Sequence, residues 1–296
     1  MDLKTNASLP LPTEMAPEIE DQEDTLQRRI NNFPWWLPAI FLIAIITAYA
    51  IATSETYRES FLFIVVGLRV TVVTTLISYS ISLVIGLITG LGRISKNVFF
   101  KNLATLYIEI IRGIPMLVLI FYIALVGVPF AVEGLNEFGV WLSSIGLGFL
   151  GTPLSKLGIQ AVSMNLRAIV ALSITYGAYT AEIFRAGIQS IGRGQMEAAR
   201  SLGMSYGQAM RHVILPQAIR NVLPAIGNDF IAMLKDSSLV SVLAVRDITQ
   251  VARLYSGRSF RFREAYTTLA VLYLTMTVLL SMAVQLIERR IRRDEK

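Results

Sequence analysis

Residues 70–91 read VTVVTTLISYSISLVIGLITGL, a run of 22 residues without a charged side chain. At about 1.5 Å per residue, a helix of this length crosses the roughly 30 Å hydrocarbon core of a bilayer. Arg69 stands at one end of the run, where its long side chain can reach the polar lipid surface. The run therefore predicts a membrane-spanning helix.

Other parts of the chain repeat this pattern of length and low charge. Five further spans are predicted, at 35–52, 113–132, 165–187, 222–245 and 265–287. The first opens on a Trp pair suited to the lipid–water boundary, and the helix of the 113–132 span is expected to begin near Leu103. The predicted fold class is all-α: a polytopic membrane protein with about six transmembrane helices.

Composition agrees with a membrane location. Of 296 residues, 54% are hydrophobic and 16% charged, against about 25% charged in ordinary soluble domains. The mean hydropathy is +0.57. The absence of cysteine excludes disulfides, zinc–thiolate sites and cysteine nucleophiles, and the single histidine excludes a multi-histidine metal site. We expect no catalytic set and no metal site in this chain.

The placement of the positive charges predicts an orientation. With six spans, most Lys and Arg clusters fall on one side, at 28–29, 93–101, 185–220 and 289–293. By the positive-inside rule that side is cytoplasmic, with both termini inside, so the net charge of +6 is no sign of nucleic-acid binding.

One arginine-rich loop breaks this rule. Its five arginines would lie outside: Arg246, Arg253, Arg258, Arg261 and Arg263. Either the 222–245 segment is re-entrant, or these arginines have a partner outside the membrane. We favour the second explanation, because three basic loops and the C-terminal tail support the six-span orientation.

The segment between the fourth and fifth spans, QMEAARSLGMSYGQAMRHVILP at 195–216, predicts two short helices. Gly203 ends the first, Ser205 starts the second with a capping-box spacing to Gln208, and Pro216 is expected to begin the next helix. Physical chemistry alone favours a plain amphipathic loop helix at the membrane surface.

This segment resembles the EAA loop of ABC importer permeases. The resemblance rests on Glu197-Ala198-Ala199, on Gly203 four residues later, and on Leu215-Pro216. Three other stretches resemble the polar amino-acid branch of that family, of the histidine and glutamine type: YIEIIRGIP at 107–115, YGAYTAEIFRAG at 176–187 and KDSSL at 235–239. The similarity covers about residues 60–290.

The resemblance implies a type I ABC importer permease bundle and a division of the chain. It assigns 61–290 to a permease core with a cytoplasmic coupling segment at 190–216. Composition and hydropathy assign 1–29 to a disordered acidic tail, 30–60 to an extra transmembrane helix and outer loop, and 291–296 to a basic tail. A long Gly-rich outer loop at about 129–157 is a second departure from the family pattern, besides the additional first span and tail.

The family pattern makes 195–216 a coupling helix that docks on an ATPase. Ala198 and Ala199 would allow close approach, Gly203 the turn, and Glu197 an ion pair with the partner, while Leu215 and Pro216 complete the motif. The chain lacks a Gly-Lys phosphate loop, so ATP and Mg²⁺ are expected on the partner and no cofactor in this chain.

The partners that the resemblance implies are a cytoplasmic ABC ATPase dimer, a second permease subunit forming a homo- or heterodimer, and an extracytoplasmic amino-acid-binding protein. Membrane lipid surrounds the subunit, and no nucleic acid is expected. The implied location is the bacterial inner membrane.

Two carboxylates in the fifth span are candidates for the substrate path. Asp229 and Asp236 lie seven residues apart and hence on one helix face, where they could hold the ammonium group of an amino acid. Alternatively, Asp236 caps a broken helix and Asp229 bonds to a neighbouring span. Ionisable groups at membrane depth usually face a cavity or a partner, and the resemblance makes this helix path-lining.

Four other residues complete the candidate path: Gly113, Pro115, Thr175 and Met233. Gly113 and Pro115 are expected to kink the third span and free backbone groups for a carboxylate. Glu109 and Arg112, at i and i+3, are expected to form a salt bridge.

The predicted function is therefore that of a permease subunit in an ATP-driven importer, moving polar amino acids by alternating access. The alternative is an ion-coupled secondary transporter, in which Asp229 and Asp236 would carry protons or sodium. A membrane-embedded enzyme is disfavoured, because the sequence offers no Ser/His/Asp set and no metal cluster.

Overall fold

The computed structural model describes residues 36–293, with side chains from 38 to 290. The tail predicted at 1–29 and the final residues 294–296 lie outside the described part. Contacts divide the chain into two compact units, residues 1–48 and 49–296. The described part of the first unit belongs to one apolar helix, and the described backbone of both units contains helices and no strand.

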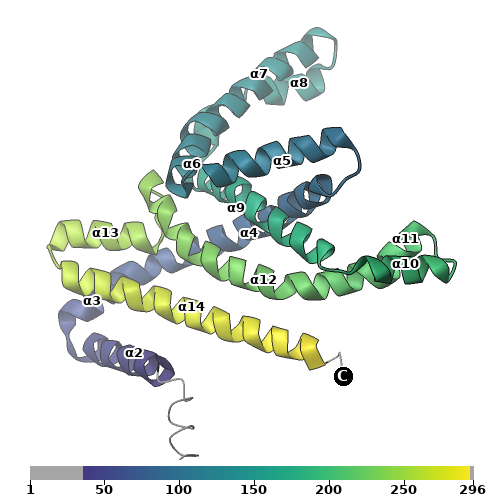
Figure 1. The fold of residues 1–296 in the computed structure, drawn as a ribbon. Helices are drawn as coiled ribbons and strands as arrows, with labels where there is room; N and C mark the ends of the chain where they lie inside the picture. Colours follow the sequence, from purple (N-terminus) through teal and green to yellow (C-terminus); the bar gives the residue numbers. More distant parts are fainter. Residues whose placement is uncertain (1–35, 294–296) are drawn as a thin grey trace, which may run out of the picture. The chain divides into compact units, whose positions relative to one another are not determined.

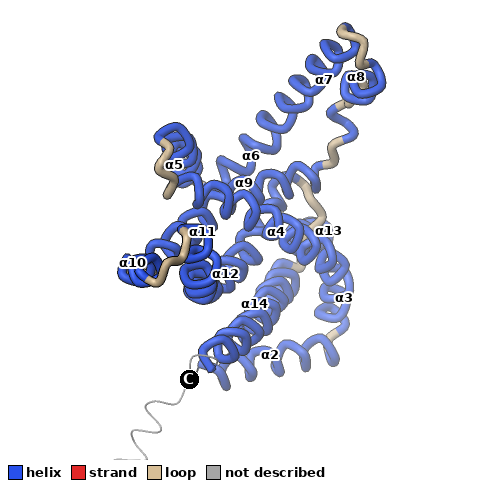
Figure 2. Tube along the Cα trace, turned by 90° about the vertical axis from the view of Figure 1, so that its right-hand side faces the viewer, coloured by secondary structure: helices blue, strands red, loops and turns tan. Residues whose placement is uncertain are grey.

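The elements follow one another along the chain as coloured in Figure 1. They are α2 (Trp36–Thr53), α3 (Glu55–Ile64), η1 (Val65–Gly67), α4 (Leu68–Arg93), α5 (Val98–Gly113), α6 (Met116–Tyr122), η2 (Ile123–Gly127), α7 (Val128–Ser144), α8 (Gly148–Ser155), η3 (Ile159–Ala161), α9 (Met164–Gln189), α10 (Arg193–Ser201), α11 (Tyr206–Ala209), η4 (Met210–Ile214), α12 (Leu215–Asp236), η5 (Ser237–Leu243), α13 (Ile248–Ser259) and α14 (Phe262–Arg293). The tube in Figure 2 shows that loops are short and helices dominate.

Three continuous helical stretches in the described residues are long and apolar enough to cross a membrane: Glu55–Arg93, Met116–Ser144 and Phe262–Arg290. They contain the spans predicted at 70–91 and 265–287 and most of the one predicted at 113–132. A shorter apolar helix, Pro38–Thr53, covers most of the first predicted span. The helices α9 and α12 are long enough, with 26 and 22 residues, but carry more charge.

Helices α4 and α9 form the most extensive pairing of the second unit. Small residues recur every fourth position along the contact face of α4: Thr74, Ser78, Ser82, Gly86 and Gly90. A Cβ atom at Gly90 would lie 2.7 Å from the carbonyl oxygen of Ala181 on α9, so the backbones approach closely. Such stripes of small residues promote helix packing in membranes.

Polar bonds across the helix pairs fix their relative directions. Thr74 Oγ1 donates to Asn165 Oδ1 at 2.9 Å, and Thr180 Oγ1 donates to the carbonyl of Ser82 at 2.9 Å, so α4 and α9 run parallel. The bond from Asn221 Nδ2 to Ser190 Oγ, at 2.9 Å, joins the start of α12 to the end of α9. The two helices are therefore antiparallel, as alternating membrane crossings require.

The chain does not kink at Gly113 and Pro115 within one helix, as the sequence suggested, but breaks there. Helix α5 begins at Val98, earlier than the predicted start, and ends at Gly113. Ile114 is extended, with φ −109° and ψ 137°, and Pro115 caps the new helix α6. The extended conformation before proline is the expected one, because the proline ring disfavours a helical residue at that place.

The long outer loop predicted at 129–157 is mostly helical. Helix α7 continues to Ser144, and α8 folds back against it, forming a hairpin that extends beyond α6 in Figure 1. Gly139 and Gly151 permit the close packing: a Cβ atom at Gly139 would lie 2.5 Å from the backbone nitrogen of Ser155. The glycines that suggested a loop thus serve a helix–helix contact.

Candidate functional site

A cavity of about 770 Å³ lies beside α9 and α12. Charged groups of both signs line it: the carboxylates of Glu182, Asp229 and Glu288 and the guanidinium groups of Arg112 and Arg220. The remaining walls are small, amide, hydroxyl and apolar residues, namely Tyr179, Ile183, Ala186, Gly187, Ser190, Asn221, Pro224 and Ala225. A cavity with convergent charges of opposite sign can hold a small molecule that carries both.

Asp229 is the acidic residue that reaches this cavity from the interior of α12. Its Oδ2 atom is buried and has no hydrogen-bond partner in the described part of the chain. The nearby Tyr79 hydroxyl donates instead to the carbonyl of Ile226, at 2.6 Å. Because buried carboxylate oxygens are costly without a donor, the free oxygen is a candidate acceptor for a cationic ligand group.

The other residues predicted for the substrate path do not line this cavity. Asp236 accepts a hydrogen bond from the Tyr176 hydroxyl at 2.7 Å, on the side of α12 that packs against α9. Met233 and Thr175 are fully buried, and Thr175 Oγ1 has no partner among the described residues.

Gly113 and Pro115 are exposed at the break between α5 and α6. The structure therefore places one of the six candidates, Asp229, on the cavity wall.

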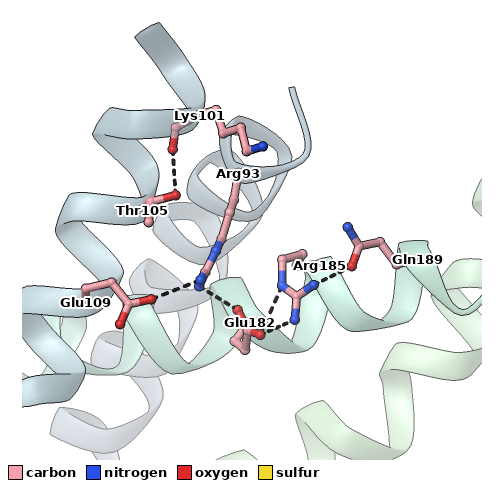
Figure 3. A network of polar contacts seen from close by, with 7 residues as sticks. All are labelled: Arg93, Lys101, Thr105, Glu109, Glu182, Arg185 and Gln189. Carbon is pink, nitrogen blue, oxygen red and sulfur yellow. Dashed lines mark hydrogen bonds and ion pairs between the residues drawn. The ribbon is translucent and has the colours of Figure 1, made fainter. Parts of the chain in front are cut away.

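An ion-pair network joins three helices, as Figure 3 shows, and one of its residues, Glu182, also lines the cavity. Arg93, at the end of α4, bonds to Glu182 on α9 at 2.9 Å and to Glu109 on α5 at 3.0 Å. Arg185 also bonds to Glu182 and to the side chain of Gln189. One arginine at the end of α4 thus connects both neighbouring helices.

This network corrects the salt bridge expected between Glu109 and Arg112. Glu109 pairs with Arg93, while the Arg112 guanidinium lies 5.8 Å from the centre of the Tyr179 ring and lines the cavity. The helical spacing places Glu109 and Arg112 near each other, but the Glu109 carboxylate pairs with Arg93 on another helix, α4. Arg112 is consequently available for a cation–π contact and for the cavity.

The segment predicted to couple to an ATPase forms two short helices with a sharp turn between them. Helix α10 ends at Ser201, and Gly203 has a positive φ of 82°, a conformation that favours glycine. Ser205 then caps α11 through the complete capping box with Gln208, as the sequence predicted.

Glu197, Ala198 and Gly203 are exposed on this segment, while Ala199 is buried within it. Ala199 therefore packs inside the segment and does not offer the surface for close approach that the sequence suggested. Two large residues are exposed beside the turn: Leu202 at 81% and Tyr206 at 62%.

Pro216 lies in the first turn of α12, as expected, but no break separates that helix from the segment before it. Helix runs without interruption from Tyr206 to Asp236, and the π-helical segment η4 precedes the proline. The Leu215 N–H bonds to the carbonyl of Met210, five residues back, and the side-chain amide of Gln217 donates to the carbonyl of Val213 at 2.9 Å. The first of these bonds is that of a π turn, which directly precedes the proline, and Leu215 and Pro216 are exposed.

Two of the arginines predicted to have a partner outside the membrane lie near carboxylates of this chain. Arg261 bonds to Glu59 at 2.5 Å, and Arg263 lies 3.6 Å from Glu264. The pairing with Glu59 was not foreseen, because the two residues are separated by 202 positions in the sequence. For Arg261 the partner is therefore in the same chain.

Several functional candidates escaped the sequence analysis. Arg220 and Glu288 line the cavity but read as members of cytoplasmic basic clusters or tails in the sequence. Tyr79 has no charge to single it out within an apolar span. In α4, the small residues Ser78, Ser82, Gly86 and Gly90 recur at every fourth position, and this spacing could have identified the face that packs against α9.

Together, the membrane-length helices, the charged cavity and the projecting helical turn define a membrane transport protein. Residues 82–293 match the family model described as binding-protein-dependent transport system inner membrane component. The chain belongs to this family.

Two relatives illustrate the match. The probable glutamine ABC transporter permease protein GlnM of Bacillus subtilis (strain 168) is 36% identical over 228 residues, covering 77% of this chain and 93% of the relative. The arginine transport system permease protein ArtQ of the same organism is 31% identical over 233 residues, covering 79% and 94%.

A solved structure shares the fold. The crystal structure of an amino acid ABC transporter with histidines has a chain that is 38% identical, with a TM-score of 0.63 and coverage of 79% of this chain and 95% of that one. This protein is thus a multi-pass permease subunit of an ABC transporter in the inner membrane. It is not an enzyme, and ATP hydrolysis belongs to a separate subunit.

Proposed function

We propose that this subunit moves polar amino acids inward through the cavity beside α9 and α12. The observation that carries the proposal is Asp229, which lines a cavity together with Arg112 and Arg220 and has a buried Oδ2 atom without a hydrogen-bond partner in the described part of the chain. An amino acid carries an ammonium and a carboxylate on one carbon, so a site with one free carboxylate and nearby guanidinium groups complements it. Relatives named for glutamine and arginine transport support this substrate class.

In this proposal Asp229 accepts from the substrate ammonium, and Arg112 or Arg220 donates to its carboxylate. Asp236 lies about 10 Å further along α12, at 1.5 Å per residue over seven residues. Its bond to Tyr176 holds α12 against α9 and closes the path at that level. Thr175 and Met233, buried at the same α9–α12 contact, would join the path when that contact opens, and the exposed backbone at Gly113 and Pro115 would join it from the α5–α6 break.

The test compares uptake by the assembled transporter, with its ATPase and binding protein, across the twenty amino acids. We expect Asp229→Asn to lower uptake of the preferred amino acid by roughly tenfold or more, because a charge-assisted bond becomes a neutral one. Glu137→Gln, at an exposed carboxylate on α7, is the matched control and should transport like wild type. Wild-type uptake by Asp229→Asn would contradict the proposed site.

We propose further that the coupling segment docks on the cytoplasmic ATPase. Glu197 and Ala198 are exposed on α10, and Leu202 and Tyr206 present apolar surface beside the Gly203 turn. A charged group next to exposed apolar side chains is typical of a contact with an apolar core and a polar rim. The motif residues Leu215 and Pro216 follow in the same continuous helix.

Substitutions in the coupling segment should separate transport from substrate binding. Glu197→Lys and Leu202→Asp are expected to reduce co-purification of the ATPase and to abolish ATP-dependent uptake. Ser201→Ala is the control, because it removes only an exposed bond to the carbonyl of Glu197. Normal ATPase retention in both variants would refute docking at this segment.

A transporter of this kind works with a second permease subunit, which we propose to be a copy of this chain or a similar one. The alternative of an ion-coupled secondary transporter receives no support from the relatives, which are ABC transporter permeases. ATP-dependent uptake that persists after the membrane potential is collapsed would separate the two mechanisms.

A further inference from the structure

A second cavity, of about 790 Å³, lies between the start of the α3–α4 helix and α13. Apolar side chains from both elements form most of its wall, including Leu62, Phe63, Val66, Val251 and Leu254. We call this the outer cavity. The outer cavity lies at the start of the helical stretch that ends at Arg93. Arg93 itself pairs with Glu182 on α9, near the end of α9 that leads to the coupling segment. The outer cavity and the coupling segment are thus at opposite ends of α4.

Three charged residues line the outer cavity, Glu59, Arg246 and Arg258. Glu59 is already neutralised by its ion pair with Arg261. Arg246 and Arg258 are exposed, and neither forms an ion pair with another residue in the part of the chain that the structure describes. The mouth of an apolar cavity therefore carries two uncompensated positive charges.

The backbone that follows Arg246 is held in place by its contacts. Asp247, between Arg246 and α13, is buried and caps α13 by accepting from the N–H groups of Thr249 and Gln250. The backbone of Asp247 also lies against Gly67, where a Cβ atom would come within 2.7 Å of it. Arg246 therefore precedes a residue that is held in place, and Arg258 lies on α13, the helix that Asp247 caps.

We propose that the outer cavity receives an acidic side chain and an adjoining apolar side chain of the extracytoplasmic binding protein. The charge of Arg246 and Arg258 is complementary to a carboxylate, and the apolar walls would bury the adjoining side chain. This inference rests on the proposed function, including the orientation that puts α13 outside. It assigns docking to Arg246 and Arg258 and excludes Arg261, which Glu59 holds.

The test uses the complete transporter in lipid nanodiscs and measures the binding-protein concentration that gives half-maximal stimulation of ATP hydrolysis. The double variant Arg246→Glu/Arg258→Glu should raise this concentration by about tenfold or more, because like charges would meet at the contact. Val66→Trp should have a similar effect without any change of charge, since it fills the cavity from an exposed position. Basal ATP hydrolysis should stay unchanged in both.

Arg253→Glu is the matched control. Arg253 is exposed on the same helix but does not line the outer cavity, so its reversal should change the half-maximal concentration by less than about twofold. Raising the salt concentration should weaken stimulation in wild type and partly restore it in the double variant, because screening reduces an attraction in the first and a repulsion in the second.

The possible results distinguish a failure of the proposed function from a failure of docking at the outer cavity. If no binding protein stimulates the wild-type transporter, the proposed function fails. If wild type is stimulated and the double variant and Val66→Trp respond at the same concentration as wild type, the outer cavity is not the docking site, while the proposed function stands. If neutral lipid in place of anionic lipid reproduces the defect in wild type, the arginines bind a lipid headgroup and the inference is overturned.

Discussion

At the residue scale, small side chains decide how closely the central helices pack. Gly86 and Gly90 on α4 leave no room for a Cβ atom against α9, and Thr180 uses the same contact to donate to the Ser82 carbonyl. Membrane helices gain little from burying apolar surface against each other, since lipid is equally apolar. Close contact and polar bonds therefore supply the specificity of this pair.

Gly90→Ala should destabilise the protein by about 1–3 kcal/mol, because the added methyl group would meet the rigid Ala181 backbone. Thermal unfolding in detergent measures the effect. Gly134→Ala in α7 provides the control: it meets nothing within 4 Å, so the better helix former should leave stability unchanged or raise it by up to about 1 kcal/mol. An equal response to both substitutions would contradict the packing argument.

Residue identity alone singled out Asp229 but not the residues that surround it in the cavity. Asp229 was singled out because a carboxylate is rare at membrane depth, and it lies on a cavity. Its partners in that cavity, Arg112, Arg220 and Glu288, come from α5, α12 and α14. Residues on different helices are brought together only by tertiary packing, which spacing along one helix does not encode.

At the element scale, local signals located helix ends well and helix interruptions poorly. The Ser205 capping box and the Gly203 turn were predicted from neighbouring residues, because their geometry depends on three or four positions. Pro216 suggested a break before the next helix, but a π turn precedes it and the helix continues from Tyr206. Gly139 and Gly151 suggested a loop, but they lie at the contact between α7 and α8.

Helix α13 depends on a buried acidic cap, which should make its stability sensitive to pH. Burial raises the pKa of Asp247 above its ordinary value of 3.8, although N–H bonds from Gln250 and Thr249 oppose the shift. The folded state then binds this proton more tightly than the unfolded state. The stabilisation is full below the unfolded pKa and is lost as the pH rises through the folded pKa.

Asp247→Asn should flatten that dependence. The amide oxygen of asparagine can still accept from the helix N–H groups, so α13 keeps a cap, but the side chain no longer titrates. We expect the melting temperature of the wild type to fall more than that of the variant as the pH rises from about 4 towards neutrality. Parallel pH profiles for the two proteins would show that Asp247 does not titrate in this way.

At the scale of the whole molecule, the helix directions agree with alternating membrane crossings. The α4 and α9 helices run parallel, α12 runs opposite to α9, and the network around Arg93 lies at the end of α9 that leads to the coupling segment. Basic residues cluster at that end in the sequence. The fold class and the family were predictable because hydropathy and motif spacing are properties of the whole chain.

The natural absence of cysteine gives a direct test of this orientation. Gly207→Cys in α11 and Gly257→Cys in α13 would place single thiols at positions with open space around them. In spheroplasts, a membrane-impermeant maleimide should label Gly257→Cys at once and Gly207→Cys only after permeabilisation. The reverse order would invert the topology and place the Arg-rich segment in the cytoplasm.

The uninterrupted helix from Tyr206 to Asp236 has a mechanical consequence. It spans 31 residues, or about 46 Å, and carries both an exposed aromatic residue of the coupling segment and the cavity carboxylate Asp229. No loop lies between the two to absorb a displacement, but the helix has two irregular places on the way to Asp229: the π turn at 210–214 and Pro224 inside α12. A displacement of the coupling segment would therefore reach Asp229 through these two places, so replacing Pro224 or altering the π turn should change how far that displacement is transmitted.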